Sequence, residues 1–200
     1  MNTTSTIVMA KAPLPGYAKT RLIPALGAAG AAALAQRLLD HTVAQAVAAA
    51  LGPVDLCCAP DATHPALARH AGAGLQLSAQ GDGDLGQRMA RAFARWLPQG
   101  PVLMIGTDAP ALDTSVLRQA AAALQWADAV FVPALDGGYA LIGLRRAAPT
   151  LFDGIAWSTP QVMAQTRERL AAAGLLHHEL APLADIDEPA DLVHLPPGWR

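Results

Sequence analysis

Three basic side chains are concentrated in one loop near the start of the chain. The segment KAPLPGYAKTRL holds Lys11, Lys19 and Arg21, and its two lysines are the only ones in the 200-residue sequence. In a loop rich in proline and glycine, lysine point charges and a forked arginine suit a di- or triphosphate. A solvated surface loop is the alternative interpretation. The segment matches neither the dinucleotide pattern G-x-G-x-x-G nor a P-loop, which disfavours dehydrogenases and P-loop kinases.

Two later loops carry an aspartate beside glycine. In IGTDAP, Asp108 follows a hydrophobic run and could ligate Mg²⁺ or Mn²⁺ that neutralises a diphosphate, although aspartate is also common there as a turn or cap residue. In LDGGY, Asp136 could hold a sugar hydroxyl or act as a base. The following Gly137 and Gly138 would let the backbone approach a substrate, but the triplet is also an ordinary turn signal.

An acidic segment, ADIDEPADL, lies near the end of the sequence. Asp185 and Asp187 alternate along it, so both should face one side, as a second arm of a metal site would require. The alternative is an acidic cap for a short helix that begins at Pro189. Trp157, which precedes the sequence S-T-P, is either a packing anchor or a substrate contact.

Composition excludes several classes of protein. With 52% hydrophobic and 15% charged residues, the chain should fold rather than remain disordered. A net charge of −2 and 4% aromatic residues argue against a nucleic-acid or membrane-surface binder. The adjacent Cys57 and Cys58 suit neither a disulfide nor a C-x-x-C metal site. No zinc spacing of histidines, no G-x-S-x-G elbow, no run of about 18 uncharged apolar residues and no secretory pattern is found, so a cytoplasmic protein is expected.

Short β-rich runs alternate with alanine-rich helical stretches along the chain. Strands are expected at 6–10, 54–59, 75–79, 102–105, 129–132, 139–144 and 176–180. Helices are expected at 28–50, 84–97, 114–125 (capped by Asp113 or Thr114) and 158–173 (started by Ser158-Thr159-Pro160). This order predicts one α/β domain, residues 1–200, with a mostly parallel sheet. Because ligands bind beyond the carboxyl ends of such strands, the three loops should converge at one edge.

Six motifs in order resemble a known family over residues from Ile7 to about Leu192. They are K-A-P-x-P-G-x-A-K-T-R-L, G-D-L-G-Q-R-M, G-T-D-A-P-x-L, D-G-G-Y-x-L-I-G-L, W-S-T-P and D-I-D-E-P-A-D-L. The chain resembles the glycosyltransferase-A-like bacterial family of arsenosugar-biosynthesis-like glycosyltransferases, which is related to phospholactate guanylyltransferase and molybdenum-cofactor nucleotidyltransferases. The resemblance implies a single-domain nucleotide-diphospho-sugar transferase fold, a mostly parallel mixed sheet with helices on both faces, and a divalent metal, Mg²⁺ or Mn²⁺.

The resemblance also implies a role for each candidate residue. Asp108 and Asp136 would be catalytic, and Asp108, Asp185 and Asp187 would hold the metal. Nucleotide or phosphate contacts would come from Lys11, Lys19, Arg21, Asp84 and Arg88. The acceptor or sugar would lie near Gly137, Gly138, Tyr139 and Trp157.

Three functions fit these residues. The first is transfer of a glycosyl group from a nucleotide-activated sugar to a small acceptor, with stabilisation of the leaving diphosphate as the main catalytic effect. The second is transfer of a nucleoside monophosphate from a triphosphate to a phosphorylated small molecule, with release of pyrophosphate. The third is nucleotide binding without catalysis, which Ala111 and Ala190 favour because relatives often carry an acid there. The phosphate-binding loop is common to all three, and the oligomeric state is left open.

Overall fold

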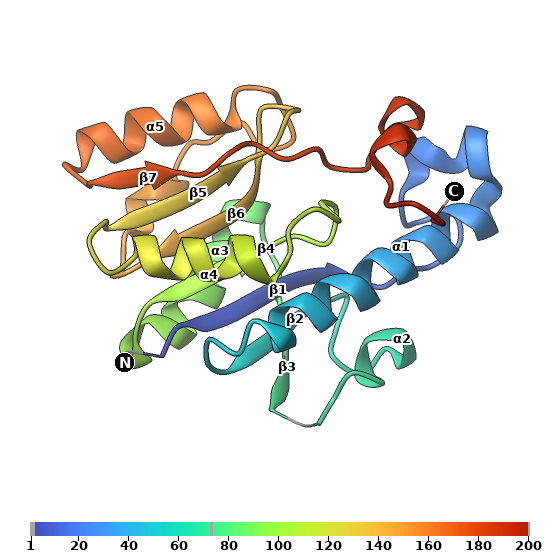
Figure 1. Cartoon of the computed structure of the whole chain (residues 1–200), viewed down its shortest axis with the longest axis horizontal. Helices are drawn as coiled ribbons and strands as arrows, with labels where there is room; N and C mark the ends of the chain where they lie inside the picture. The colour runs from blue at the N-terminus through green and yellow to red at the C-terminus, as the bar shows by residue number, and fades with distance from the viewer. Residues whose placement is uncertain (1–2, 73, 200) are drawn as a thin grey trace.

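Seven strands form one mixed sheet within residues 3–72 and 74–199, the residues that the computed structural model describes (Figure 1). They are β1 (Ser5–Lys11), β2 (Val54–Ala59), β3 (Leu75–Ala79), β4 (Val102–Ile105), β5 (Ala129–Pro133), β6 (Tyr139–Leu144) and β7 (His177–Glu179). Their order is β3-β2-β1-β4-β6-β5-β7. Strand β6 is antiparallel to β4 and to β5, and the other pairs are parallel. The expected mostly parallel mixed sheet is confirmed.

Helices cover both faces of this sheet, as the sequence predicted (Figure 1). The helices are α1 (Ile23–Ala48), α2 (Pro65–Ala68), α3 (Leu85–Trp96), α4 (Thr114–Ala123) and α5 (Val162–Ala172). Short 3-10 helices are η1 (Thr20–Leu22), η2 (Leu97–Gln99), η3 (Pro149–Phe152) and η4 (Pro189–His194). Side chains of α1 and α4 pack in one core cluster, and those of α3 and α5 pack in another.

Alternation along the strands divides the core into these two layers. In β1, Val8 joins the layer under α1 and α4, whereas its neighbour Ile7 joins the layer under α3 and α5. In β2, Cys58 and Cys57 separate in the same way. Both cysteines are buried and free, so the sequence prediction that they form no disulfide is confirmed.

Aspartates start two of the helices, but the start of α5 differs from the prediction. Asp113, not Thr114, caps α4 by accepting a hydrogen bond of 2.9 Å from the Val116 amide. Helix α5 begins at Val162, so a start at Ser158 was wrong. Ser158 has a φ of 62°, and the Thr159 hydroxyl donates to the Ala156 carbonyl at 2.7 Å, so this segment forms a turn before the helix.

Helix α1 starts earlier than predicted and contains a break at Gly27, where φ is 70° and ψ is 164°. The segment Thr20–Ala48 is long and apolar enough to cross a membrane by length and composition alone. A core helix meets the same criterion, and here Leu34, Leu38 and Leu39 are buried against the sheet or the end of the chain. The composition of α1 is therefore weak evidence for a membrane span.

The last part of the chain crosses the sheet. Figure 1 shows the red C-terminal segment leaving β7 and running to the start of α1. We call residues 180–188 the crossing segment. Ile186 in this segment is fully buried and packs with Leu22, Leu34 and Leu38, so the two ends of the chain share a small third core.

The tight packing of β6 between β4 and β5 gives a test of the fold. A Cβ on Gly143 would lie 2.5 Å from Val130 Cγ1 and 2.7 Å from Leu103 Cδ2. We expect Gly143→Ala to lower the free energy of unfolding by about 1–3 kcal/mol, because overpacking forces neighbouring side chains to move. Gly106→Ala is the matched control, since a Cβ there meets no atom within 4 Å. Equal melting temperatures of the two variants would contradict this packing.

Candidate active site

The crossing segment connects three loops at the carboxyl edge of the sheet. The Leu183 amide donates to the Pro133 carbonyl at 2.9 Å, at the last residue of β5. The Ile186 amide donates to the Asp108 carbonyl at 2.8 Å, in the loop after β4. The Ile186 carbonyl accepts a hydrogen bond from Lys19, in the loop after β1. The segment thus connects the three strand-end loops at the carboxyl edge of the sheet, where the sequence predicted that they would meet.

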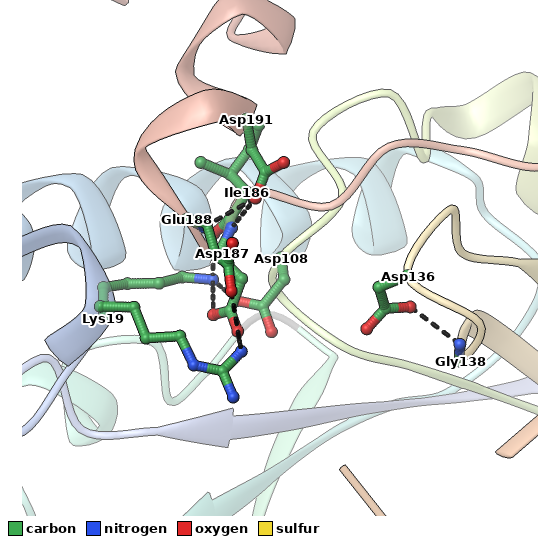
Figure 2. Close-up of polar contacts among 9 residues, drawn as sticks. Lys19, Asp108, Asp136, Gly138, Ile186, Asp187, Glu188 and Asp191 are labelled. Atoms are coloured by element: carbon green, nitrogen blue, oxygen red, sulfur yellow. Dashed lines mark hydrogen bonds and ion pairs between the residues drawn. The ribbon is translucent and has the colours of Figure 1, made fainter. Parts of the chain in front are cut away.

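Lys19 is the most enclosed charged group of this arrangement. Its side chain is 7% exposed, and its ammonium forms ion pairs with Asp108 Oδ1 and, at 3.4 Å, with Asp187 Oδ1 (Figure 2). A buried ammonium needs such oxygens to replace its lost hydration. Two carboxylates and the Ile186 carbonyl therefore converge on one cation.

The other two basic residues of the loop are more exposed. Arg21 Nη1 donates to Asp187 Oδ2 at 2.9 Å, and its side chain is 60% exposed. Lys11 stands at the end of β1 and donates to the Tyr17 carbonyl at 3.2 Å. Both cations can therefore turn toward a bound anion without a large desolvation cost.

A first pocket of about 340 Å³ collects these groups. Its charged lining consists of Lys11, Lys19, Arg21, Asp108 and Asp187. Gln80, Leu85 and Thr107 add polar and apolar lining. Three cations in one cavity at the carboxyl edge of a sheet suit a ligand that carries several phosphate charges.

A second pocket of about 260 Å³ adjoins the first and shares Arg21 and Asp187 with it. Its lining is mainly acidic, with Asp136, Asp185, Glu188 and Asp191 beside Leu135, Ala184 and His194. Asp136 Oδ1 accepts the Gly138 amide at 2.8 Å, so this aspartate forms a turn and also lines the pocket (Figure 2).

Asp185 is the carboxyl group whose ionisation this environment disfavours most clearly. Burial raises its pKa, and the nearby charges of Asp136, Asp191 and Asp108 raise it further. Asp185 lines the second pocket only, whereas Asp187 lines both. The two aspartates thus lie along one pocket, but Lys19 and Arg21 pair with Asp187.

The oxygens around Lys19 fit a divalent cation that also binds substrate. Among residues 3–72 and 74–199, no three His, Cys, Asp or Glu side chains converge as a complete metal site. Mg²⁺ is nevertheless commonly held by one or two carboxylates together with substrate phosphates and water. Asp108 and Asp187 already meet at one positive charge, so these two carboxylates have the placement and chemistry for such an ion.

Asp84 and Arg88 have structural roles instead of lining the first pocket. Asp84 Oδ1 accepts the Gln87 amide at 2.8 Å, and the Gln87 side chain accepts the Asp84 amide at 3.1 Å, which forms a capping box for α3. Arg88 Nε donates to the Gly83 carbonyl at 2.8 Å. Leu85, between them, lines the pocket. The expected nucleotide contacts of Asp84 and Arg88 thus find no support in this geometry.

Tyr139 and Trp157 are packing residues. The Tyr139 ring lies 5.5 Å from that of Phe131, its hydroxyl is 4.0 Å from Met89 Sδ, and burial raises the pKa of the phenol. A Cβ on Gly86 would lie 2.9 Å from the Trp157 indole, so this ring fills the space above a glycine of α3. Neither aromatic residue lines either pocket. Their observed contacts join the sheet, α3 and the turn before α5, and their expected contacts with an acceptor stay a prediction.

Gly137 and Gly138 also have structural roles, in the turn after β5. Gly137 has a φ of 92°, its carbonyl accepts the Met163 amide at 2.8 Å, and a Cβ would overlap the Pro160 carbonyl. The Gly138 amide belongs to the Asp136 turn. The glycines therefore position Asp136 and the start of α5, and neither lines a pocket.

Two further residues support the site without having been singled out from the sequence. Gln80 is buried, lines the first pocket and donates to the Ala10 and Cys57 carbonyls, both at 3.0 Å. Asp191 Oδ2 accepts the amides of Asp187 at 3.0 Å and Glu188 at 2.6 Å. Gln80 follows β3 directly, so the tendency of ligands to bind beyond strand ends was a signal for it. Asp191 stands three residues after Glu188, so the capping-box spacing was a signal for Asp191.

Comparison with known proteins places the chain in a family. Residues 42–159 match the model of the bacterial family described as "uncharacterized protein conserved in bacteria", DUF2064. The chain belongs to this family. The sheet order and the two adjoining pockets described above are therefore those of one member of DUF2064. No curated protein matches the sequence.

Solved structures share this DUF2064 fold. A protein from Desulfovibrio desulfuricans, described as a candidate nucleotide-diphospho-sugar transferase, is 32% identical with a TM-score of 0.88, and the match covers 96% of this chain and 85% of that one. A CMP:2-keto-3-deoxy-manno-octonic acid synthetase in complex with CTP is 12% identical, with a TM-score of 0.58 and 96% coverage of both chains. Rv0371c of Mycobacterium tuberculosis in complex with manganese is 15% identical, with a TM-score of 0.59 and coverage of 96% and 97%. The nucleotide-diphospho-sugar transferase fold that the motifs imply is confirmed.

The acidic second pocket predicts an unusual response of stability to pH. Asp185 has a higher pKa in the folded than in the unfolded chain, so its ionisation destabilises the fold as pH rises through the folded pKa. In metal-free buffer, Asp185→Asn should raise the melting temperature by about 1–3 °C at pH 8 and by much less near pH 3.5. Asp82→Asn, an exposed aspartate outside both pockets, is the control. A gain that is independent of pH would contradict the account of Asp185.

Proposed function

We propose that this protein is a transferase that binds the phosphates of a nucleotide-activated substrate in the first pocket. The observation that carries the proposal is the convergence of Lys11, Lys19 and Arg21 with two carboxylates in one cavity at the carboxyl edge of the sheet. The description of the 32%-identical relative as a candidate nucleotide-diphospho-sugar transferase supports it. We infer that the reaction is transfer of a glycosyl group from a nucleotide sugar to a small acceptor.

In this proposal the two pockets hold the two substrates. The donor's phosphates lie in the first pocket against Lys11 and Arg21, which neutralise charge as the nucleoside diphosphate leaves. Asp108 and Asp187 would hold a Mg²⁺ or Mn²⁺ ion, which would neutralise further charge on these phosphates. The acceptor lies in the second pocket, which adjoins the first through Arg21 and Asp187. There the Asp136 carboxylate, which lines this pocket, would accept the proton of the acceptor's hydroxyl group.

Nucleotidyl transfer is the second candidate, with one observation in its favour. The synthetase structure that covers 96% of the chain contains CTP, a triphosphate. Three cations in the first pocket suit a triphosphate as well as a diphosphate. The reaction would then release pyrophosphate instead of a nucleoside diphosphate. Non-catalytic nucleotide binding, the third candidate, has less support because Asp108, Asp187 and all three loop cations line the first pocket together.

Ligand-dependent thermal stability tests the first pocket. The wild-type protein is melted with a panel of nucleoside triphosphates and nucleotide sugars, with and without Mg²⁺ or Mn²⁺. A ligand at 100 times its Kd should stabilise the fold by about 2.7 kcal/mol. In Asp108→Asn the metal-dependent part of the shift should disappear, whereas it should persist in Asp82→Asn. A metal-dependent shift of full size in Asp108→Asn would contradict the proposed metal ligand.

Product analysis separates the two reactions. With the donor found by the panel, release of a nucleoside diphosphate supports glycosyl transfer, and release of pyrophosphate supports nucleotidyl transfer. Asp136→Asn should lower kcat by about 10²–10⁴-fold, because the acceptor's proton loses its base, while the donor's Kd stays within about twofold. Unchanged kcat in this variant would remove Asp136 from the mechanism.

A further inference from the structure

Lys19 differs from Lys11 and Arg21, the other basic residues of the first pocket, because its ammonium is enclosed. Its ammonium contacts Asp108, Asp187 and the Ile186 carbonyl, and only 7% of its side chain is exposed. Lys11, the other lysine, contacts the Tyr17 carbonyl and is exposed. Lys19 thus occupies the point at which the two proposed metal ligands meet, as a metal ion would.

A divalent ion and the Lys19 ammonium need the same oxygens. The ammonium uses Asp108 Oδ1 and Asp187 Oδ1, so a metal bound between these carboxylates would stand within a few ångströms of a like charge. Like charges at such a distance repel strongly in a partly buried site. The phosphates that enter with the metal provide another partner for the displaced ammonium.

We propose that Lys19 is an exchangeable internal counter-ion. Without a divalent metal it neutralises Asp108 and Asp187; when the metal binds these carboxylates, the ammonium moves to the donor's phosphate. The inference rests on the proposed metal site and adds an order of events to it. The ion pair with Lys19 keeps the crossing segment on the loop after β4, so the pocket is formed before substrate enters.

The backbone of Lys19 fits this exchange. Its φ of 47° and ψ of 47° are uncommon for a residue other than glycine. The conformation is held by the Leu22 amide, which donates to the Lys19 carbonyl at 2.9 Å, and by the full burial of the Leu22 side chain. The Cα of Lys19 is therefore anchored, while its four-carbon side chain can move the ammonium between two partners.

The first test measures Mn²⁺ binding by calorimetry in the absence of nucleotide. Lys19→Met removes the competing cation, so its Kd for Mn²⁺ should be at least about tenfold lower than that of the wild type. Lys11→Met is the matched control, because it removes the same charge from the same loop without touching either carboxylate. Its effect acts at a distance only and should stay below about threefold. Asp108→Asn should abolish the binding.

The second test needs no variant of Lys19. Because the sequence has two lysines, protein labelled with ¹³C-lysine gives two ε-methylene NMR signals, and the signal that persists in Lys11→Met belongs to Lys19. Addition of Mg²⁺ should shift the Lys19 signal and leave that of Lys11 in place. Addition of pyrophosphate with Mg²⁺ should shift the Lys19 signal again, as the ammonium acquires a phosphate partner.

The outcomes separate this inference from the proposed function. Equal Mn²⁺ affinities of Lys19→Met and Lys11→Met overturn the exchange and leave the metal site standing. If Lys19→Met does not fold, a Lys19 signal that Mg²⁺ leaves unmoved overturns the exchange. Failure of the wild type and both lysine variants to bind Mn²⁺, with and without pyrophosphate, overturns the exchange together with the metal in the proposed function.

Discussion

The site depends on the need of one buried ammonium for oxygen partners. Lys19 lies in the loop after the first strand, but its partners come from the loop after β4 and from the crossing segment near the other end of the chain. These contacts hold Asp187 against the first pocket and leave Asp185 in the second. One ion-paired group therefore joins the loops and the crossing segment that line the first pocket and border the second.

The fold was predictable where local sequence decides the structure. The apolar runs of β2, β3, β4 and β6 are bounded by turn residues, and their expected and observed bounds are identical. The predicted start of α5 was wrong because S-T-P matches a cap pattern in the sequence, whereas Ser158 adopts a left-handed backbone conformation. Tertiary contacts of the turn, including the Met163 amide on Gly137, decide that geometry, and they are not visible in the motif.

The candidate site was predictable as a location more than as a set of contacts. Because parallel strands end at one edge, the loops with Lys11, Lys19 and Asp108 were expected to meet, and all three line the first pocket. The pairing of Lys19 with Asp187, 168 residues away, was not predictable, because it depends on the path of the crossing segment. The burial of the Tyr139 phenol was not predictable either, because it depends on packing against Phe131 and Met89.

A crystal structure with Mg²⁺ and the nucleotide that stabilises the protein most would test the central claim most directly. The account predicts that the phosphates lie in the first pocket within hydrogen-bonding distance of Lys11, Lys19 and Arg21. It also predicts that Asp108 and Asp187 hold the Mg²⁺ ion. A nucleotide bound elsewhere, or an ammonium of Lys19 that still pairs with both carboxylates while metal and phosphate are bound, would contradict it.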